Sequence, residues 1–315
     1  TARPHLDDTH FLIGGGVSEL NNKTDDIFYA MKKMNSDFMI WMGDNIKSDL
    51  DENNIDFRSL VDQYVKTRSN TALNEFLQST PQIATWDDID YGMEKGGNEW
   101  ALKDTAFYAF DMFWPNALKK TYNYTFWDYG VYQKYAYNDI DVFLLDARFF
   151  REETTDDSPS LFGDTQIERL FEEINKSGAT FTFIVSPTPF LFSGEESLLN
   201  YEKQLDHFMY RLKISGAEGV ILLSGGQNAE PSFDRSNKSA TRFKKYEKDP
   251  NWSDMRFWHP VYEFNFGSIA NGDSQNFSRI KVEGKSGKRV CIIETFNEIG
   301  ERLFIKRIHE NELKF

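Results

Sequence analysis

The feature that most constrains the fold is a repeated succession of short apolar runs, each followed by a polar or glycine-rich segment. Four runs end in GGGVS (14–18), WMGDN (41–45), TWDDID (85–90) and LLSGGQNAE (222–230). Amphipathic segments such as TDDIFYAMKKM (24–34) lie between them, with apolar residues at helical spacing. This alternation is typical of layered α/β folds. Because sites in such folds form at the carboxyl ends of strands, the four polar segments are expected to converge on one cleft.

The same patterns predict the remaining elements. Helices are expected at 24–34, twice within 54–78, at 99–113, at 163–177 and, as one long helix, at 195–215. Residues 128–150 should form an antiparallel strand pair, and strands should dominate after 255, with a final hairpin at 296–304. The polar and charged segment 234–254 is expected to be an exposed excursion.

The composition of the chain excludes some classes of binding partner. The formal net charge is −14, so the phosphate backbone of a nucleic acid would be repelled and nucleic-acid binding is not expected. No apolar run approaches the ~18 residues of a membrane span, so no transmembrane segment is expected. The first residues resemble no signal peptide, which leaves room for a leader or lipid anchor upstream of Thr1. The single Cys291 is interpreted as a buried, small apolar residue.

Six segments resemble, in order and spacing, the PhoD-like alkaline phosphatase/phosphodiesterase family of metallophosphatases. They are DFMIWMGDNIKSD, TPQIATWDDIDYGMEKGG, DVFLLDARFFRE, LFGDTQIERL, FIVSPTPF and GVILLSGGQNAE. The resemblance implies an αββα sandwich of two mixed sheets flanked by helices. It also implies one domain over 1–315, with a core at about 11–230 that C-terminal strands at about 255–315 complete. In that family the loops hold metal ions that activate water and polarise phosphate.

Several positions where the resemblance implies metal ligands carry other residues. A cysteine is replaced by Gly16, a tyrosine by Lys47, a histidine by Ile89, an aspartate by Gly226 and a second histidine by Asn228. None of the five histidines falls in a ligand motif. We therefore expect no catalytic residue and no cofactor, with Asp44, Asp87 and Asn228 as weak candidates for holding Ca²⁺ or another divalent metal.

The surviving aspartates, Asp44, Asp87 and Asp88, would repel one another if they converged without a cation. We hypothesise that Lys47 supplies the missing positive charge. A simpler interpretation of Asp87, Asp88 and Asp90 is that they cap a helix or turn. For Arg148 and Arg151, which follow a strand, anion binding and ion pairing with nearby acids both stay open.

Three functions follow. The first is a catalytically inactive PhoD-like domain with a structural or protein-binding role in an exported envelope or cell-surface assembly. The resemblance implies a location in the periplasm or at the cell surface, where attachment as a lipoprotein is one of the options. The alternative is a divergent metal-dependent phosphomonoesterase or phosphodiesterase with a reduced site. The third is a binder of phosphorylated or glycan ligands, with Lys47 and Arg148 as anion-binding residues.

Overall fold

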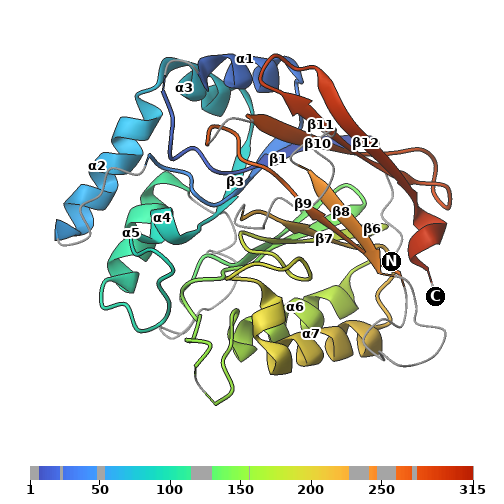
Figure 1. Ribbon diagram of the computed structural model, residues 1–315. Helices are drawn as coiled ribbons and strands as arrows, with labels where there is room; N and C mark the ends of the chain where they lie inside the picture. The colour runs from blue at the N-terminus through green and yellow to red at the C-terminus, as the bar shows by residue number, and fades with distance from the viewer. Residues whose placement is uncertain are drawn as a thin grey trace.

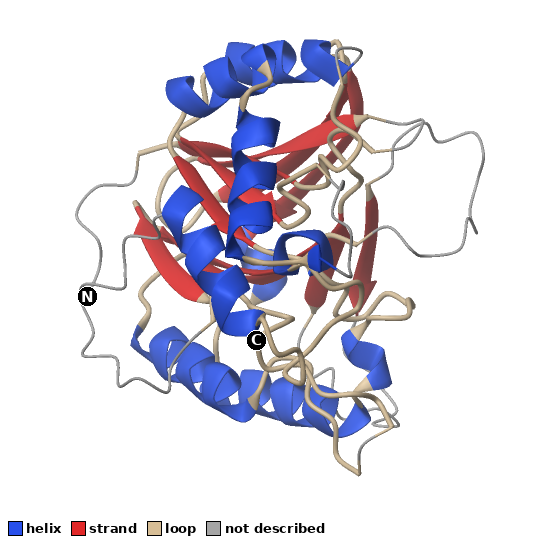
Figure 2. Ribbon diagram, turned by 90° about the vertical axis from the view of Figure 1, so that its left-hand side faces the viewer, coloured by secondary structure: helices blue, strands red, loops and turns tan. Residues whose placement is uncertain are grey.

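The computed structural model describes residues 7–21, 24–47, 54–114, 130–155, 157–226, 241–246, 260–271 and 275–314. Two six-stranded mixed sheets pack face to face, and helices cover both outer sides (Figure 1 and Figure 2). This architecture confirms the predicted αββα sandwich.

The first sheet has the order β12-β11-β10-β1-β2-β3. Its strands are β1 (Thr9–Gly14), β2 (Phe38–Met42), β3 (Gln82–Thr85), β10 (Asn276–Glu283), β11 (Val290–Asn297) and β12 (Arg302–His309). The first three strands are parallel, and β10 pairs with β1 in antiparallel register from Thr9 opposite Val282 to Ile13 opposite Ser278. The antiparallel β11–β12 pair confirms the predicted final hairpin.

The second sheet has the order β4-β5-β6-β7-β9-β8. Its strands are β4 (Gln133–Tyr137), β5 (Ile140–Leu144), β6 (Phe181–Ser186), β7 (Val220–Ser224), β8 (Arg242–Tyr246) and β9 (Val261–Asn265). The antiparallel β4–β5 pair was predicted. The excursion expected at 234–254 needs correction, because β8 lies within it and pairs with β9; its other residues, apart from Thr241, lie outside the described ranges.

The space between the sheets is filled by alternate side chains of the strands. Phe11 and Phe38 stack with ring centroids 4.8 Å apart, and Phe11 meets the edge of Phe183 from the opposite sheet. Cys291 is fully buried in the same core, as predicted, and its burial raises the pKa of the thiol. This close apolar packing fixes the two sheets relative to each other, and it thereby also fixes the loops at their edges.

Five α-helices pack on the first sheet and two on the second (Figure 1). The first group is α1 (Asp25–Lys33), α2 (Phe57–Arg68), α3 (Thr71–Ser79), α4 (Asp88–Tyr91) and α5 (Lys103–Phe113), and the second is α6 (Asp164–Lys176) and α7 (Glu202–Ser215). Among the described residues, short 3-10 helices include η4 (Leu198–Asn200) and η5 (Glu310–Leu313). Among the described helices, none is long and apolar enough to cross a membrane.

The prediction of one long helix at 195–215 is wrong. The chain forms η4 first and then leaves helical geometry at Tyr201, whose φ of −114° and ψ of 64° separate η4 from α7. The Tyr201 ring is buried, and its hydroxyl accepts a hydrogen bond from Arg151 Nε at 3.1 Å. A tertiary contact therefore overrides the local helical pattern.

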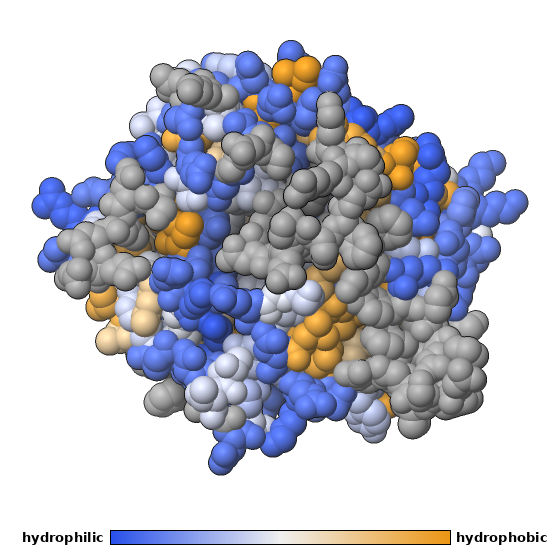
Figure 3. All heavy atoms as spheres, in the orientation of Figure 1, coloured by the Kyte–Doolittle hydropathy of each residue, from blue (hydrophilic) through white to orange (hydrophobic). Residues whose placement is uncertain are grey.

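The surface of the described residues is mainly hydrophilic on the face drawn in Figure 3, where apolar side chains form small separate patches. The aromatic segment 107–114 divides between core and surface. Phe107, Phe110 and Trp114 are buried, whereas Tyr108 is exposed. The other aromatic segment, 122–137, lies outside the described residues up to position 129, and its second half includes β4.

Candidate metal centre

The four polar segments do converge. The loops that follow β1, β2, β3 and β7 meet the loop after β9 around a cavity of about 40 Å³. Its lining consists of Gly15, Gly16, Met42, Gly43, Asp44, Asp87, Gly225, Gly226, Phe266, Gly267 and Ser268. The predicted cleft is thereby confirmed. The β9 loop was missed, although its FNFGS sequence (264–268) follows an apolar run in the same way as the other four segments.

Glycine lets the loops approach one another closely. Gly16 N–H donates to the Gly43 carbonyl at 3.0 Å, and Val17 N–H donates to the Asp44 carbonyl at 2.8 Å. Gly43 has a φ of +97°, and a Cβ there would lie 2.5 Å from Asp87 Cβ. Only glycine suits this position, because a side chain would be strained and would push the two aspartate loops apart.

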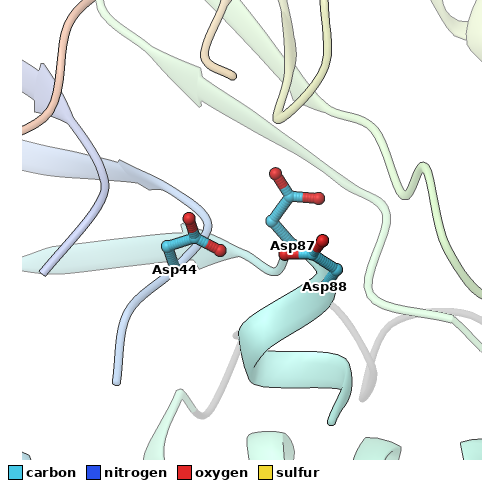
Figure 4. A group of neighbouring side chains, drawn as sticks. All are labelled: Asp44, Asp87 and Asp88. Carbon is cyan, nitrogen blue, oxygen red and sulfur yellow. The ribbon is translucent and has the colours of Figure 1, made fainter. Parts of the chain in front are cut away.

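Three carboxylates meet at this edge. Asp44 comes from the loop after β2, while Asp87 and Asp88 stand at the start of α4, with ligand atoms of all three within 4.8 Å of one another (Figure 4). Among the described residues, the buried Oδ1 atom of Asp44 has no hydrogen-bond partner. Burial, followed by repulsion from the neighbouring aspartates, raises the pKa of Asp44. Burial raises the pKa of Asp87 to about 7.

The fourth aspartate of the cluster has a structural role. Asp90 is fully buried and accepts hydrogen bonds from the Asp87 N–H at 3.1 Å, the Asn45 N–H at 3.1 Å and the Tyr64 hydroxyl at 3.2 Å. Asp87 is the N-cap residue of α4. The interpretation of these aspartates as helix-capping residues is therefore confirmed for Asp90, whose carboxylate accepts the N–H of the N-cap residue Asp87.

The cation beside the aspartates is Arg148. Its guanidinium is fully buried and donates from Nε to Asp87 Oδ1 at 2.7 Å, with a second bond from Nη2 to the same oxygen. On its other side, Nη1 and Nη2 donate to Glu196 Oε1 and Oε2 at 2.5 and 2.8 Å. Asp88 Oδ2 lies 4.0 Å from Nη2. Of the two roles left open for Arg148, the structure shows ion pairing.

The hypothesis that Lys47 provides this charge needs correction. Arg148 takes that place, and Lys47 lines a separate cavity of about 710 Å³ with Leu20, Lys66 and Thr67 among its neighbours. The Lys47 N–H donates to Thr67 Oγ1 at 2.8 Å. Proximity in the sequence favoured Lys47, which is only three positions from Asp44. The Arg148 contact instead joins loops that follow strands of different sheets.

The remaining predicted positions divide between core and cleft. Ile89 is half-buried and packs against the apolar cluster between the first sheet and its helices. Gly226 lies at the cavity with a φ of +78°. Gly16 also lines it, and a Cβ there would stand 2.8 Å from Ser268 Oγ. Asn228 lies outside the described residues.

Sequence reasoning missed two acidic residues. Glu196 pairs with Arg148, and Glu263 is fully buried beneath the β7 loop. Glu263 accepts from the Ser224 hydroxyl at 2.7 Å and from the backbone N–H groups of Phe190 and Leu191 at 2.9 and 2.7 Å. The glutamate within the apolar strand VYEFN (261–265) was the available signal, because a charged residue in a buried strand requires partners.

A two-sheet sandwich with carboxylates on converging strand-end loops is the arrangement of metallophosphatase-type folds. A model of the PhoD-like phosphatase family matches residues 21–207, more than half of the chain. The chain therefore belongs to the PhoD-like phosphatase family. No curated protein matches its sequence.

Two solved structures are similar to this chain in fold. One titled "Structure of PhoD" is similar with a TM-score of 0.71 and 14% identity, covering 98% of this chain and 73% of that chain. Another, described as GAP50, the anchor in the inner membrane complex of Plasmodium, has a TM-score of 0.50 and 10% identity, covering 96% of this chain and 89% of that chain. At these identities the likeness concerns the fold.

Proposed function

We propose that this PhoD-like domain does not hydrolyse phosphate esters and serves instead as a structural or protein-binding component of an exported envelope or cell-surface assembly. The observation that carries the proposal is the buried Arg148 guanidinium, which makes two bonds to Asp87 Oδ1. An oxygen that accepts two bonds from a cation is a poor ligand for a metal ion.

The cleft is also poorly equipped for a cluster of several ions. Gly16, Lys47, Ile89 and Gly226 provide no thiolate, phenolate, imidazole or carboxylate. The cavity of about 40 Å³ has room for one ion or a few waters, since one water needs ~10–15 Å³. These residues do not fit the multinuclear centre that the family implies.

The competing proposal is a divergent phosphomonoesterase or phosphodiesterase with a single hard cation. The unpartnered Oδ1 of Asp44 favours it, as do the three carboxylates within 4.8 Å. Carboxylate oxygens are the ligands that Ca²⁺ and Mg²⁺ prefer, and Asp44 with Asp88 would hold such an ion. Bound there, it would polarise a phosphate oxygen and lower the pKa of a water.

The binding role and the location are supported by comparison with other proteins. The GAP50 structure, similar in fold, is described as an anchor, which is a role of the kind proposed here. The exported location follows from the family resemblance alone. A periplasmic or cell-surface placement, with or without a lipid anchor, is accordingly part of the proposal.

The proposal is tested by measuring the metal content of the protein and its hydrolysis of phosphate esters. The purified protein is incubated with Ca²⁺, Mn²⁺, Fe²⁺ and Zn²⁺, freed of excess metal, and analysed by elemental mass spectrometry. The same samples are assayed with p-nitrophenyl phosphate and bis-p-nitrophenyl phosphate. We expect no stoichiometric metal and no turnover. Turnover that needs a divalent ion and disappears in Asp44→Asn would establish the enzyme instead.

A further inference from the structure

Two adjacent glutamates hold three cations beside the cleft. Glu196 pairs with Arg148 through both oxygens and lies 3.2 Å from Arg151 Nη1. Glu195 lies 2.5 Å from Lys95 Nζ. Both glutamates belong to the segment between β6 and η4, so one short piece of chain neutralises a cluster of two arginines and a lysine.

Glu196 forms the outer side of this cluster. The Arg148 side chain is 0% exposed, Arg151 is 9% exposed and Glu196 is 17% exposed. The glutamate carboxylate is therefore more accessible to solvent than either guanidinium group that it binds. Its neighbour Glu195 is 67% exposed, so the segment that carries both residues runs along the surface.

The two guanidinium groups are held by contacts other than Glu196. Asp87 binds Arg148 from the side of the cleft. Arg151 donates from Nε to the Tyr201 hydroxyl at 3.1 Å and from Nη1 to the Lys95 carbonyl. If Glu196 moved away, both groups would keep these bonds and would stay in place as preorganised donors.

We propose that Glu196 occupies a binding site for a phosphate dianion and that Arg148 and Arg151 form this site once Glu196 is displaced. A carboxylate that bridges two guanidinium groups marks the position of an anion with several acceptor oxygens. A phosphate dianion offers three acceptor oxygens and twice the charge of a carboxylate, and it suits the fork of an arginine. Lys95 lies at the edge and adds a third cation.

Glu196 also determines when phosphate can bind. With Glu196 in place, Asp44, Asp87, Asp88 and Glu196 surround Arg148, and an approaching anion meets repulsion. The site is therefore closed at rest and admits phosphate only when the glutamate leaves. This inference goes beyond the proposed function and does not depend on it, because binding at the arginines needs neither metal nor hydrolysis.

The test compares Glu196→Ala with Glu195→Ala, which removes the same side chain one position away and leaves both guanidinium groups covered. Binding of inorganic phosphate and of O-phosphoserine is measured by isothermal titration calorimetry in the presence of EDTA, so that metal-bound phosphate does not contribute. We expect the Glu196→Ala protein to bind one of them with an affinity on the order of 1 mM or better, at least about tenfold tighter than the Glu195→Ala protein.

Further variants make the result decisive. Adding Arg151→Gln to Glu196→Ala should remove the gain in phosphate affinity. If circular dichroism shows that Glu196→Ala is unfolded, Glu196→Gln, which keeps the shape of the side chain, takes its place. Tighter binding of phosphoserine identifies a phosphate ester as the ligand, and tighter binding of inorganic phosphate identifies the free ion. Equal affinities of the Glu196 and Glu195 variants, or no binding of either ligand, would overturn the proposal.

Discussion

Replacement of Arg148 by methionine tests whether this arginine stabilises the acidic cleft. Methionine keeps much of the length and apolar character of the arginine stem but carries no charge. The substitution leaves Asp87 and Glu196 facing each other without the guanidinium that both contact. Burial already raises the pKa of Asp87 to about 7 in the presence of Arg148. Without Arg148, the charged form becomes still less favourable.

The loss of stability expected for Arg148→Met can be estimated from the burial of the ion pair. Removing one partner of a buried ion pair typically costs about 3–5 kcal/mol, because the other charge is left uncompensated. In a protein of this size, 1 kcal/mol shifts the melting temperature by roughly 1.5 °C, so the expected decrease is roughly 5–8 °C. The matched control is Arg58→Met. Arg58 is 88% exposed and pairs with Asp62 at 3.9 Å, so its replacement should change stability by less than about 0.5 kcal/mol.

Urea denaturation followed by circular dichroism measures these differences at pH 8. Adding Asp87→Asn to Arg148→Met should recover part of the loss, because it removes one of the two orphaned charges. A loss similar to that of Arg58→Met, or further destabilisation by Asp87→Asn, would refute the view that Arg148 serves as the internal counter-ion.

Three further predictions concern backbone, pH and thiol. Gly43→Ala should destabilise the protein by several kcal/mol in urea titrations, because the new Cβ would lie 2.5 Å from Asp87 Cβ. The control is Gly216→Ala, which also has a positive φ but has open space around it, so it should cost only about 1–2 kcal/mol. Burial raises the pKa of Asp90 from 3.8 to about 7, so the folded state binds more protons than the unfolded state between about pH 4 and 7, and the free energy of unfolding should fall as pH rises through that window. Asp90→Asn should flatten this slope, and an unchanged slope would contradict the assignment. Cys291 should react with iodoacetamide only after unfolding, and rapid labelling of the native protein would show that its strand opens locally.

The convergence of the loops could be predicted from the sequence because it follows from a rule about strands. Apolar runs of strand length identified β1, β2 and β3 of the first sheet and β7 of the second, and sites in layered α/β folds form at the carboxyl ends of such strands. The hairpin at the end of the chain was predictable for a similar reason, since its turn residues lie between two alternating segments. Local patterns thus determine most of the elements and the position of the cleft.

The contacts within the cleft could not be predicted in the same way. Arg148 and Asp87 are 61 positions apart and come from loops of different sheets, so nothing in either segment identifies the partner. Lys47 was preferred because it is near Asp44 in sequence, yet its backbone bonds to Thr67 and it lines another cavity. The helix break at Tyr201 likewise depends on a distant contact with Arg151.

The pairing of β1 with β10 has a consequence for biosynthesis. Thr9 lies opposite Val282, so the second neighbour of the first strand is made only after most of the chain. At a typical rate of about 5–20 residues per second, that interval is on the order of tens of seconds. During it β1 has β2 on one side and an open edge on the other, and such an edge is prone to pair with other chains. The nascent protein should therefore depend on chaperone protection until β10 has emerged from the ribosome.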